Sequence, residues 1–144
     1  MTGGGDRELS PRRMEYLKFL LERGEPVTNA ALAARFGVDP STSTRTVRAL
    51  VETGLVEHES YGGIALSGRG RRCAEFLMRR HRLLALAFAR LGMEPATACA
   101  QAARCEDRIP RDVVNTICAA LGHPSRSACG DIAMDRGCCA GREE

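Results

Sequence analysis

Thiols dominate the reactive side chains of this sequence, which contains seven cysteines but only three histidines in 144 residues. The odd number of cysteines and the adjacent Cys138 and Cys139 argue against a disulfide framework of the secreted type. The cysteines form no C-x-x-C pair, so their spacing does not predict a zinc ribbon. Thiolates from distant parts of a chain can still gather around Zn²⁺ or an iron–sulfur cluster, and free or redox-active thiols are the alternatives. The cluster or redox candidates are Cys105, Cys129, Cys138 and Cys139.

The other residue patterns do not predict an enzyme. The sequence has no Gly-rich phosphate loop, no Ser-His-Asp set and no pair of carboxylates in a predicted cleft. It also has no apolar run close to the roughly 18 residues of a membrane span, and residues 1–6 lack the apolar stretch of a signal peptide. We therefore expect a cytoplasmic protein that acts by binding.

The basic residues are nearly all arginines, because Lys18 is the only lysine among the 21 basic side chains. Arginine suits bidentate contacts to phosphate and to guanine edges, although a GC-rich genome would produce the same bias. The net charge of +3 is too small to indicate a partner by itself.

Three helices are predicted in the first third of the chain, over about 11–22, 30–36 and 41–52. Ser10 and Pro11 form a typical helix start, and Gly24 forms a typical end. The expected caps of the second helix are Thr28 or Asn29. The third helix is expected to turn four residues inward, Thr44, Val47, Leu50 and Val51. Two short helices joined by a tight turn have the layout of a DNA-reading pair.

A β-hairpin follows these helices, with strands over 54–58 and 64–66 joined by a turn at 61–63. This hairpin completes a winged helix-turn-helix. Helices are then predicted over 71–90, about 95–108 and 110–121, and an irregular tail follows them. The expected fold class is mainly α, with a winged helix-turn-helix and then a helical domain. The expected domain ranges are 1–72, 73–124 and 125–144.

This order of elements, with its motifs, resembles the diphtheria-toxin-repressor and manganese-repressor family. The motifs are Gly54-Leu55-Val56-Glu57 with Tyr61-Gly62-Gly63, Arg80-His81-Arg82-Leu83-Leu84, and a Gly122-His123-Pro124 tail that ends in Gly137-Cys138-Cys139. The resemblance implies a homodimeric, metal-activated repressor that binds double-stranded DNA at a pseudo-palindromic operator. The helical domain would bind the metal and pair the subunits. The family's third, SH3-like domain has no room in this chain.

The resemblance also implies that the third helix enters the major groove. The matching DNA-contact candidates are Ser41, Thr42, Ser43, Arg45 and Arg48, joined by Thr28 at the second helix and Tyr61 in the wing. Arg45 is the predicted base reader, since an arginine there can donate two hydrogen bonds to guanine. Ser41 could instead only cap the helix. Arg69, Arg71 and Arg72 could neutralise phosphates or form a solvated face.

Family members coordinate Mn²⁺ or Fe²⁺ between the first helix and the dimerisation helices. Carried over by position, the ligand candidates are Glu15, His81, Cys99, Glu106 and Asp107. Four positions depart from the family pattern, Lys18, Ala85, Ala103 and Asp107. Cys99 and Glu106 are spaced to share one helical face, and such donors suit Fe²⁺ or Mn²⁺, with Zn²⁺ as a further possibility.

The tail departs from the family in a way that favours thiols. Family members often carry Cys-Pro-His-Gly where this chain has Ser127-Ala128-Cys129-Gly130, so a cysteine replaces the histidine. One alternative is therefore a redox- or iron–sulfur-sensing regulator. An alternative of another class is a metal-buffering or protein-interaction module that no longer binds DNA.

Overall fold

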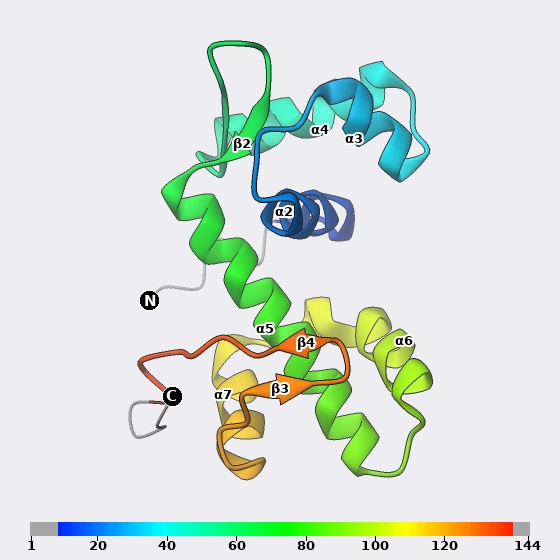
Figure 1. Cartoon of the computed structure of the whole chain (residues 1–144), viewed down its shortest axis with the longest axis vertical. Coiled ribbons are helices and arrows are strands. Elements are labelled where there is room, and N and C mark those ends of the chain that lie inside the picture. The colour runs from blue at the N-terminus through cyan, green and yellow to red at the C-terminus, as the bar shows by residue number, and fades with distance from the viewer. Residues whose placement is uncertain (1–8, 140–144) are drawn as a thin grey trace. The chain divides into compact units, whose positions relative to one another are not determined.

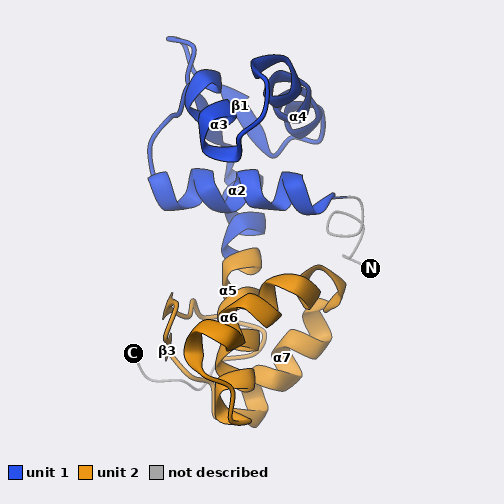
Figure 2. Cartoon of the chain, turned by 90° about the vertical axis from the view of Figure 1, so that its right-hand side faces the viewer, with its two compact units in different colours: residues 1–75 blue, residues 76–144 orange. Residues whose placement is uncertain are grey.

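A computed structural model describes residues 9–139 of the chain. The chain forms two compact units, residues 1–75 and 76–144, which are coloured separately in Figure 2. Its elements are mainly helices, as expected, in the order shown in Figure 1. Within the described range, no helix combines the length and apolar character needed to cross a membrane.

Three helices form most of unit 1: α2 (Pro11–Arg23), α3 (Asn29–Phe36) and α4 (Pro40–Glu52). The Ser10 side chain accepts a hydrogen bond from the Arg13 N–H, and the Thr28 side chain accepts one from the Ala31 N–H. Gly24 ends α2 in the left-handed conformation, with φ of 70°. Local signals in the sequence therefore set these helix ends.

The wing of unit 1 consists of β1 (Val56–His58) and β2 (Ile64–Leu66), paired antiparallel with Val56 opposite Leu66. Val27, between α2 and α3, adds a bridge to Ile64. The core beneath the wing contains the fully buried side chains Tyr16, Leu17, Leu32, Leu50 and Ile64. This core holds the helix pair and the wing together.

Helix α5 (Gly68–Arg90) begins where the wing ends. The Ser67 hydroxyl accepts a hydrogen bond from the Gly70 N–H, as an N-cap does. A Cβ at position 70 would lie 1.8 Å from the Leu55 carbonyl oxygen, so only glycine permits this approach of α5 to the chain before β1.

Unit 2 contains the rest of α5, then α6 (Pro95–Cys105), the 3₁₀ turn η1 (Glu106–Arg108), α7 (Arg111–Ala120), β3 (Arg126–Ser127) and β4 (Gly130–Asp131). The prediction of one helix through Arg108 was wrong at its end, because the α-helix stops at Cys105. The prediction of an irregular tail was also wrong in part, because β3 and β4 form an antiparallel hairpin. The segment 140–144 lies outside the described residues.

Two arginines of α5 form hydrogen bonds with the C-terminal tail, residues 125–139, and hold it against the helices of unit 2. Arg79 donates to the Asn115 side chain at 2.8 Å and to the Ala133 carbonyl at 3.2 Å, although only 3% of its surface is exposed. Arg82 donates to the Asp131 carbonyl at 2.6 Å. Arg79 and Arg82 of the arginine-rich stretch therefore form hydrogen bonds within unit 2.

Candidate DNA-binding surface and metal centres

Helix α4 presents four polar side chains on one exposed face: Ser41, Thr44, Arg45 and Arg48. Their spacing of i, i+3, i+4 and i+7 aligns them along the helix. The opposite face buries Ser43, Val47 and Leu50. The exposed set combines two hydroxyl groups with two guanidinium groups, which is a donor-rich surface suited to base edges and phosphates.

This arrangement corrects two expectations about α4. Ser43, predicted to contact DNA, is fully buried, whereas Thr44, predicted to pack inward, is exposed. Val51 is also 37% exposed instead of buried. The start of the helix differs as well, since Asp39 occupies the N-cap and Pro40 the first turn, so Ser41 does not cap it. Thr42 is half-buried and its hydroxyl lies 3.5 Å from an Arg45 guanidinium nitrogen.

A short hydrogen-bond network connects the starts of α3 and α4. The Asn29 amide donates to the Pro40 carbonyl at 3.1 Å and to the Thr44 hydroxyl at 3.2 Å. Thr44 in turn donates to the same carbonyl at 2.9 Å. These bonds connect Thr44 on the exposed face of α4 to the start of α3.

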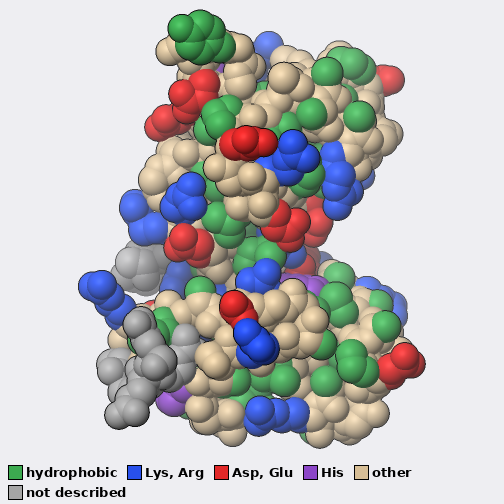
Figure 3. All heavy atoms as spheres, viewed as in Figure 1, with side chains coloured by type: hydrophobic (Ala, Val, Ile, Leu, Met, Phe, Trp, Pro, Cys, Tyr) green, Lys and Arg blue, Asp and Glu red, His purple; other side chains and the backbone are tan. Residues whose placement is uncertain are grey.

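The other two predicted DNA contacts, Thr28 and Tyr61, have different surroundings. Thr28 is exposed at the start of α3, but its hydroxyl already caps that helix. Tyr61, at the tip of the wing, is fully exposed at 102% of its reference surface. Acidic side chains lie among the Lys and Arg side chains on the face of the molecule shown in Figure 3.

One candidate metal centre lies in unit 2 around His81. Its Nε2 atom is 3.2 Å from the Cys99 sulfur, and its Nδ1 atom is 2.5 Å from a Glu106 carboxylate oxygen. His81, Cys99 and Cys129 offer ligand atoms that all lie within 4.8 Å of one another. We call these three residues the His81 group. α5, α6 and the β3–β4 hairpin each supply one member.

Glu106 is buried, with 5% of its surface exposed, and its carboxylate forms a hydrogen bond directly with the His81 imidazole. Its hydrogen bond raises the pKa of His81 above the ordinary value even though burial acts in the opposite direction. Burial raises the pKa of the Cys99 thiol, but hydrogen bonds with His81 and Cys129 outweigh it, so the Cys99 pKa is lowered overall. Burial together with the Cys99 hydrogen bond raises the pKa of Cys129. The protonation state of each of these side chains therefore depends on that of its neighbours in the group.

Three other candidate residues are described by their own neighbours. Glu15 belongs to unit 1, where it is exposed on α2 and its carboxylate is 3.6 Å from the Lys18 ammonium. Asp107 lies in η1 with its carboxylate 4.0 Å from the Arg108 guanidinium. The Cys105 thiol donates to the Gln101 carbonyl at 3.5 Å, back along α6. Their roles as ligands stay predictions.

A second group of possible ligands comprises Cys118, His123, Cys138 and Cys139. Cys138 and Cys139 are among the predicted cluster residues, whereas Cys118 and His123 are not among the predicted site residues. The signal for His123 was present, because a histidine directly follows the glycine that ends α7. Cys118 carried no signal, since a cysteine on the inward face of a helix is usually a small core residue.

The helix pair with its wing defines unit 1 as a DNA-binding domain of the winged helix-turn-helix class, and the thiol and imidazole groups define unit 2 as a metal-binding one. The sequence matches the N-terminal DNA-binding domain of the iron-dependent repressors over residues 8–64. It matches their metal-binding and dimerisation domain over residues 67–135. The chain therefore belongs to the iron-dependent repressor family, the diphtheria-toxin-repressor and manganese-repressor family that the sequence resembles.

Curated relatives agree with this assignment. An uncharacterised helix-turn-helix-type transcriptional regulator of Methanocaldococcus jannaschii is 25% identical over 100 residues, which are 69% of this chain and 80% of the relative. The transcriptional regulator MntR of Escherichia coli is 25% identical over 109 residues, 76% of this chain and 70% of MntR. These findings support a transcriptional regulator and do not support a module without DNA binding.

Solved structures share the fold. A manganese-dependent transcriptional repressor in complex with manganese has a TM-score of 0.71 and 31% identity, covering 85% of this chain and 62% of the repressor. A hypothetical protein of Sulfolobus solfataricus has a TM-score of 0.73 at 24% identity, covering 86% of this chain and 96% of that protein. The chain thus spans about three fifths of the manganese repressor's length, and a divalent transition metal is the cofactor of this family.

Proposed function

We propose that this chain is a homodimeric repressor whose affinity for a pseudo-palindromic operator increases when the His81 group binds a divalent transition ion. The observation that carries this proposal is the convergence of His81, Cys99 and Cys129 within 4.8 Å of one another. The family match supplies the two partners, because its members bind DNA through the first domain and dimerise through the second.

The donor atoms of the His81 group fit such an ion. Glu106 accepts the Nδ1 proton of His81, and this tautomer leaves Nε2 as the metal-binding nitrogen beside the Cys99 sulfur. Glu106 would therefore orient the imidazole, and Nε2 with the two sulfurs would form a set of three ligands.

The two thiolates also favour a particular ion. Sulfur ligands and imidazole suit Fe²⁺ and Zn²⁺ better than Mn²⁺, which prefers oxygen donors. Of these two ions we propose Fe²⁺ as the activating ion, because the matched family is that of the iron-dependent repressors, in contrast to the manganese of the solved repressor. In this set, Cys99 and Cys129 determine the preference.

The test is a titration of operator binding with Fe²⁺, Mn²⁺ and Zn²⁺ without oxygen, on an operator selected from random duplexes by the metal-loaded protein. We expect Fe²⁺ to tighten binding at concentrations at least tenfold below those needed for Mn²⁺. Replacing His81 by alanine should abolish this response, whereas Cys105→Ala, a thiol outside the group, should keep it. Equal responses to Fe²⁺ and Mn²⁺ would refute the ion preference, and an unchanged response of His81→Ala would refute the site.

A further inference from the structure

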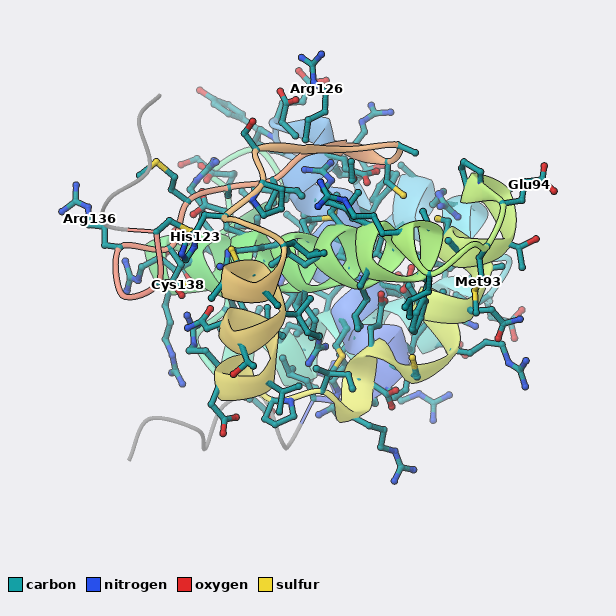
Figure 4. All side chains as sticks on the ribbon, turned by 90° about the horizontal axis from the view of Figure 1, so that it is seen from below. Met93, Glu94, His123, Arg126, Arg136 and Cys138 are labelled. Carbon is teal, nitrogen blue, oxygen red and sulfur yellow. The ribbon has the colours of Figure 1, made fainter. Side chains whose placement is uncertain are left out.

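The second group of ligands gathers where α7 ends against the last described turn of the chain. The Cys118 sulfur lies 3.5 Å from the His123 Nδ1 atom and 3.6 Å from the Cys139 sulfur. The Cys138 sulfur lies 3.6 Å from the same histidine nitrogen. All four ligand atoms lie within 4.8 Å of one another. His123 and Cys138 are labelled in Figure 4, where they lie close together.

These separations match the edges of a tetrahedron around one zinc ion. With Zn–S and Zn–N bonds of the usual length, sulfur atoms lie about 3.8 Å apart and sulfur and nitrogen about 3.6 Å apart. Three of the six edges, at 3.5, 3.6 and 3.6 Å, are close to these values, and the other three lie within 4.8 Å. A disulfide has a sulfur separation of about 2.05 Å, so Cys118 and Cys139 are not bonded to each other in this arrangement and both thiols are free to bind an ion.

The chain conformation also serves this arrangement. His123 has φ of 52°, a left-handed conformation that few residues other than glycine adopt. Its N–H bonds back to the Cys118 carbonyl at 2.8 Å, which folds the histidine over the end of α7. In the tail, the Asp135 carbonyl accepts hydrogen bonds from the N–H groups of both Cys138 and Cys139, in a turn that brings the two thiols to the same point.

The surroundings suit a negatively charged metal site. Three thiolates and one Zn²⁺ carry a net charge of about −1. The buried Arg79 guanidinium lies 3.8 Å from the Cys139 sulfur and can balance that charge. The Asn115 side chain accepts from Arg79 at 2.8 Å and so helps to hold the guanidinium beside Cys139. Such outer contacts are what orient the ligands of real metal sites.

We propose that Cys118, His123, Cys138 and Cys139 bind one structural Zn²⁺ ion, which joins the C-terminal tail to α7. All four positions of a tetrahedral ion are then filled by the protein, which is typical of structural zinc and leaves no open position for regulation. The site shares no residue with the His81 group. Zinc binding at this site can therefore be tested independently of the proposed regulatory ion.

The first measurement is the metal content of protein purified without oxygen or chelators. To isolate this site, it uses the full chain with His81→Ala and Cys99→Ala, which disables the regulatory group. We expect about one zinc ion per chain in this background, and loss of most of it when His123→Ala is added. His123→Cys is the matched variant: it keeps four ligands and should retain the zinc, while Cys105→Ala should also retain it.

Substitution by Co²⁺ provides a second measurement that does not depend on stability. The His123-containing site should give sulfur-to-cobalt charge-transfer absorption and the strong visible bands of tetrahedral Co²⁺. Those visible bands should move to lower energy in His123→Cys, since a fourth thiolate replaces nitrogen. Weak octahedral bands, an absence of zinc, full zinc retention by His123→Ala, or iron with acid-labile sulfide in place of zinc would each overturn the proposal.

Discussion

Ser43 and Arg45 lie two residues apart on α4 but differ in almost every physical respect. Ser43 is fully buried, and its hydroxyl has no hydrogen-bond partner among the described residues. Burying an unpaired hydroxyl costs about 1–3 kcal/mol. We expect Ser43→Ala to raise the free energy of unfolding by about 1 kcal/mol. Its operator affinity should stay within about twofold of wild type, because the side chain does not reach the surface.

Arg45→Ala should have the reverse profile. A bidentate arginine contact contributes about 1–3 kcal/mol to discrimination between bases, so specific operator affinity should fall about tenfold or more. The free energy of unfolding should change by less than about 0.5 kcal/mol, as for other exposed positions. Urea unfolding and fluorescence anisotropy with labelled operator measure the two quantities. Loss of DNA binding by Ser43→Ala but not by Arg45→Ala would reverse our assignment of the faces.

The sequence could not separate Ser43 from Thr44. Both are small hydroxyl residues at the edges of the apolar stripe set by Val47 and Leu50, so hydrophobicity gives no preference between them. The decision comes from Asn29 on α3, which holds Thr44 at the surface through a hydrogen bond. Contacts between helices are not encoded in the periodicity of one helix.

The ion pair between His81 and Glu106 makes the stability of the metal-free protein depend on pH. The pKa of His81 is raised in the folded state, so the folded protein binds this proton more tightly than the unfolded chain does. The stabilisation is therefore complete below the unfolded pKa of about 6.5 and is lost as the pH rises through the raised folded pKa. Cys99 faces the other ring nitrogen and contributes in the same direction.

Unfolding of wild type and Glu106→Gln by urea, with chelator present, tests this dependence. The stability advantage of wild type should be largest near pH 6, where Glu106 is ionised and His81 protonated, and should shrink toward pH 9. An advantage that is constant between these values would show that Glu106 acts through packing alone.

The junction between the wing and α5 depends on a single missing side chain. An alanine Cβ at position 70 would lie 1.8 Å from the Leu55 oxygen, and backbone cannot yield as a flexible side chain can. We expect Gly70→Ala to lower the free energy of unfolding by more than about 2 kcal/mol. Gly68→Ala is the matched control, because its nearest neighbour would be Arg72 at 3.7 Å. If Gly70→Ala is as stable as Gly68→Ala, the close approach is wrong.

The ends of a helix could be predicted from the sequence where the residues at those ends determine them. Ser10 and Pro11 begin α2 and Gly24 ends it, as the capping pattern predicted. The tail was harder, because its order comes from Arg79 and Arg82 on a helix about fifty residues earlier. The same reason hid Cys118 and His123 as partners of the final cysteines.

Helix α5 runs without a break through residue 75, the last residue of unit 1. Any influence of metal in unit 2 on DNA contacts in unit 1 that travels along the chain must cross this position. Glu75 is exposed there, so its replacement changes helix stiffness without disturbing a core. A glycine in a helix interior costs about 1 kcal/mol relative to alanine.

We therefore expect Glu75→Gly to weaken the coupling between metal and DNA by up to about fivefold, since local loss of helical structure at this position becomes about 1 kcal/mol easier. Coupling is the ratio of operator dissociation constants without and with metal. Glu75→Ala should leave this ratio unchanged, and calorimetry should find the same metal affinity in both variants. An unaltered ratio in Glu75→Gly would mean that α5 does not carry the coupling.

The β3–β4 hairpin bears on how fast a bound ion can leave the His81 group, as well as on how tightly the ion is bound. It supplies Cys129 to the His81 group, and Arg82 holds it to α5 through the Asp131 carbonyl. An ion bound by Cys129 can depart only as fast as this ligand lets go, and the fastened hairpin slows that step. A regulator built in this way would respond to a fall in metal supply more slowly than one whose Cys129 loop is not held to α5.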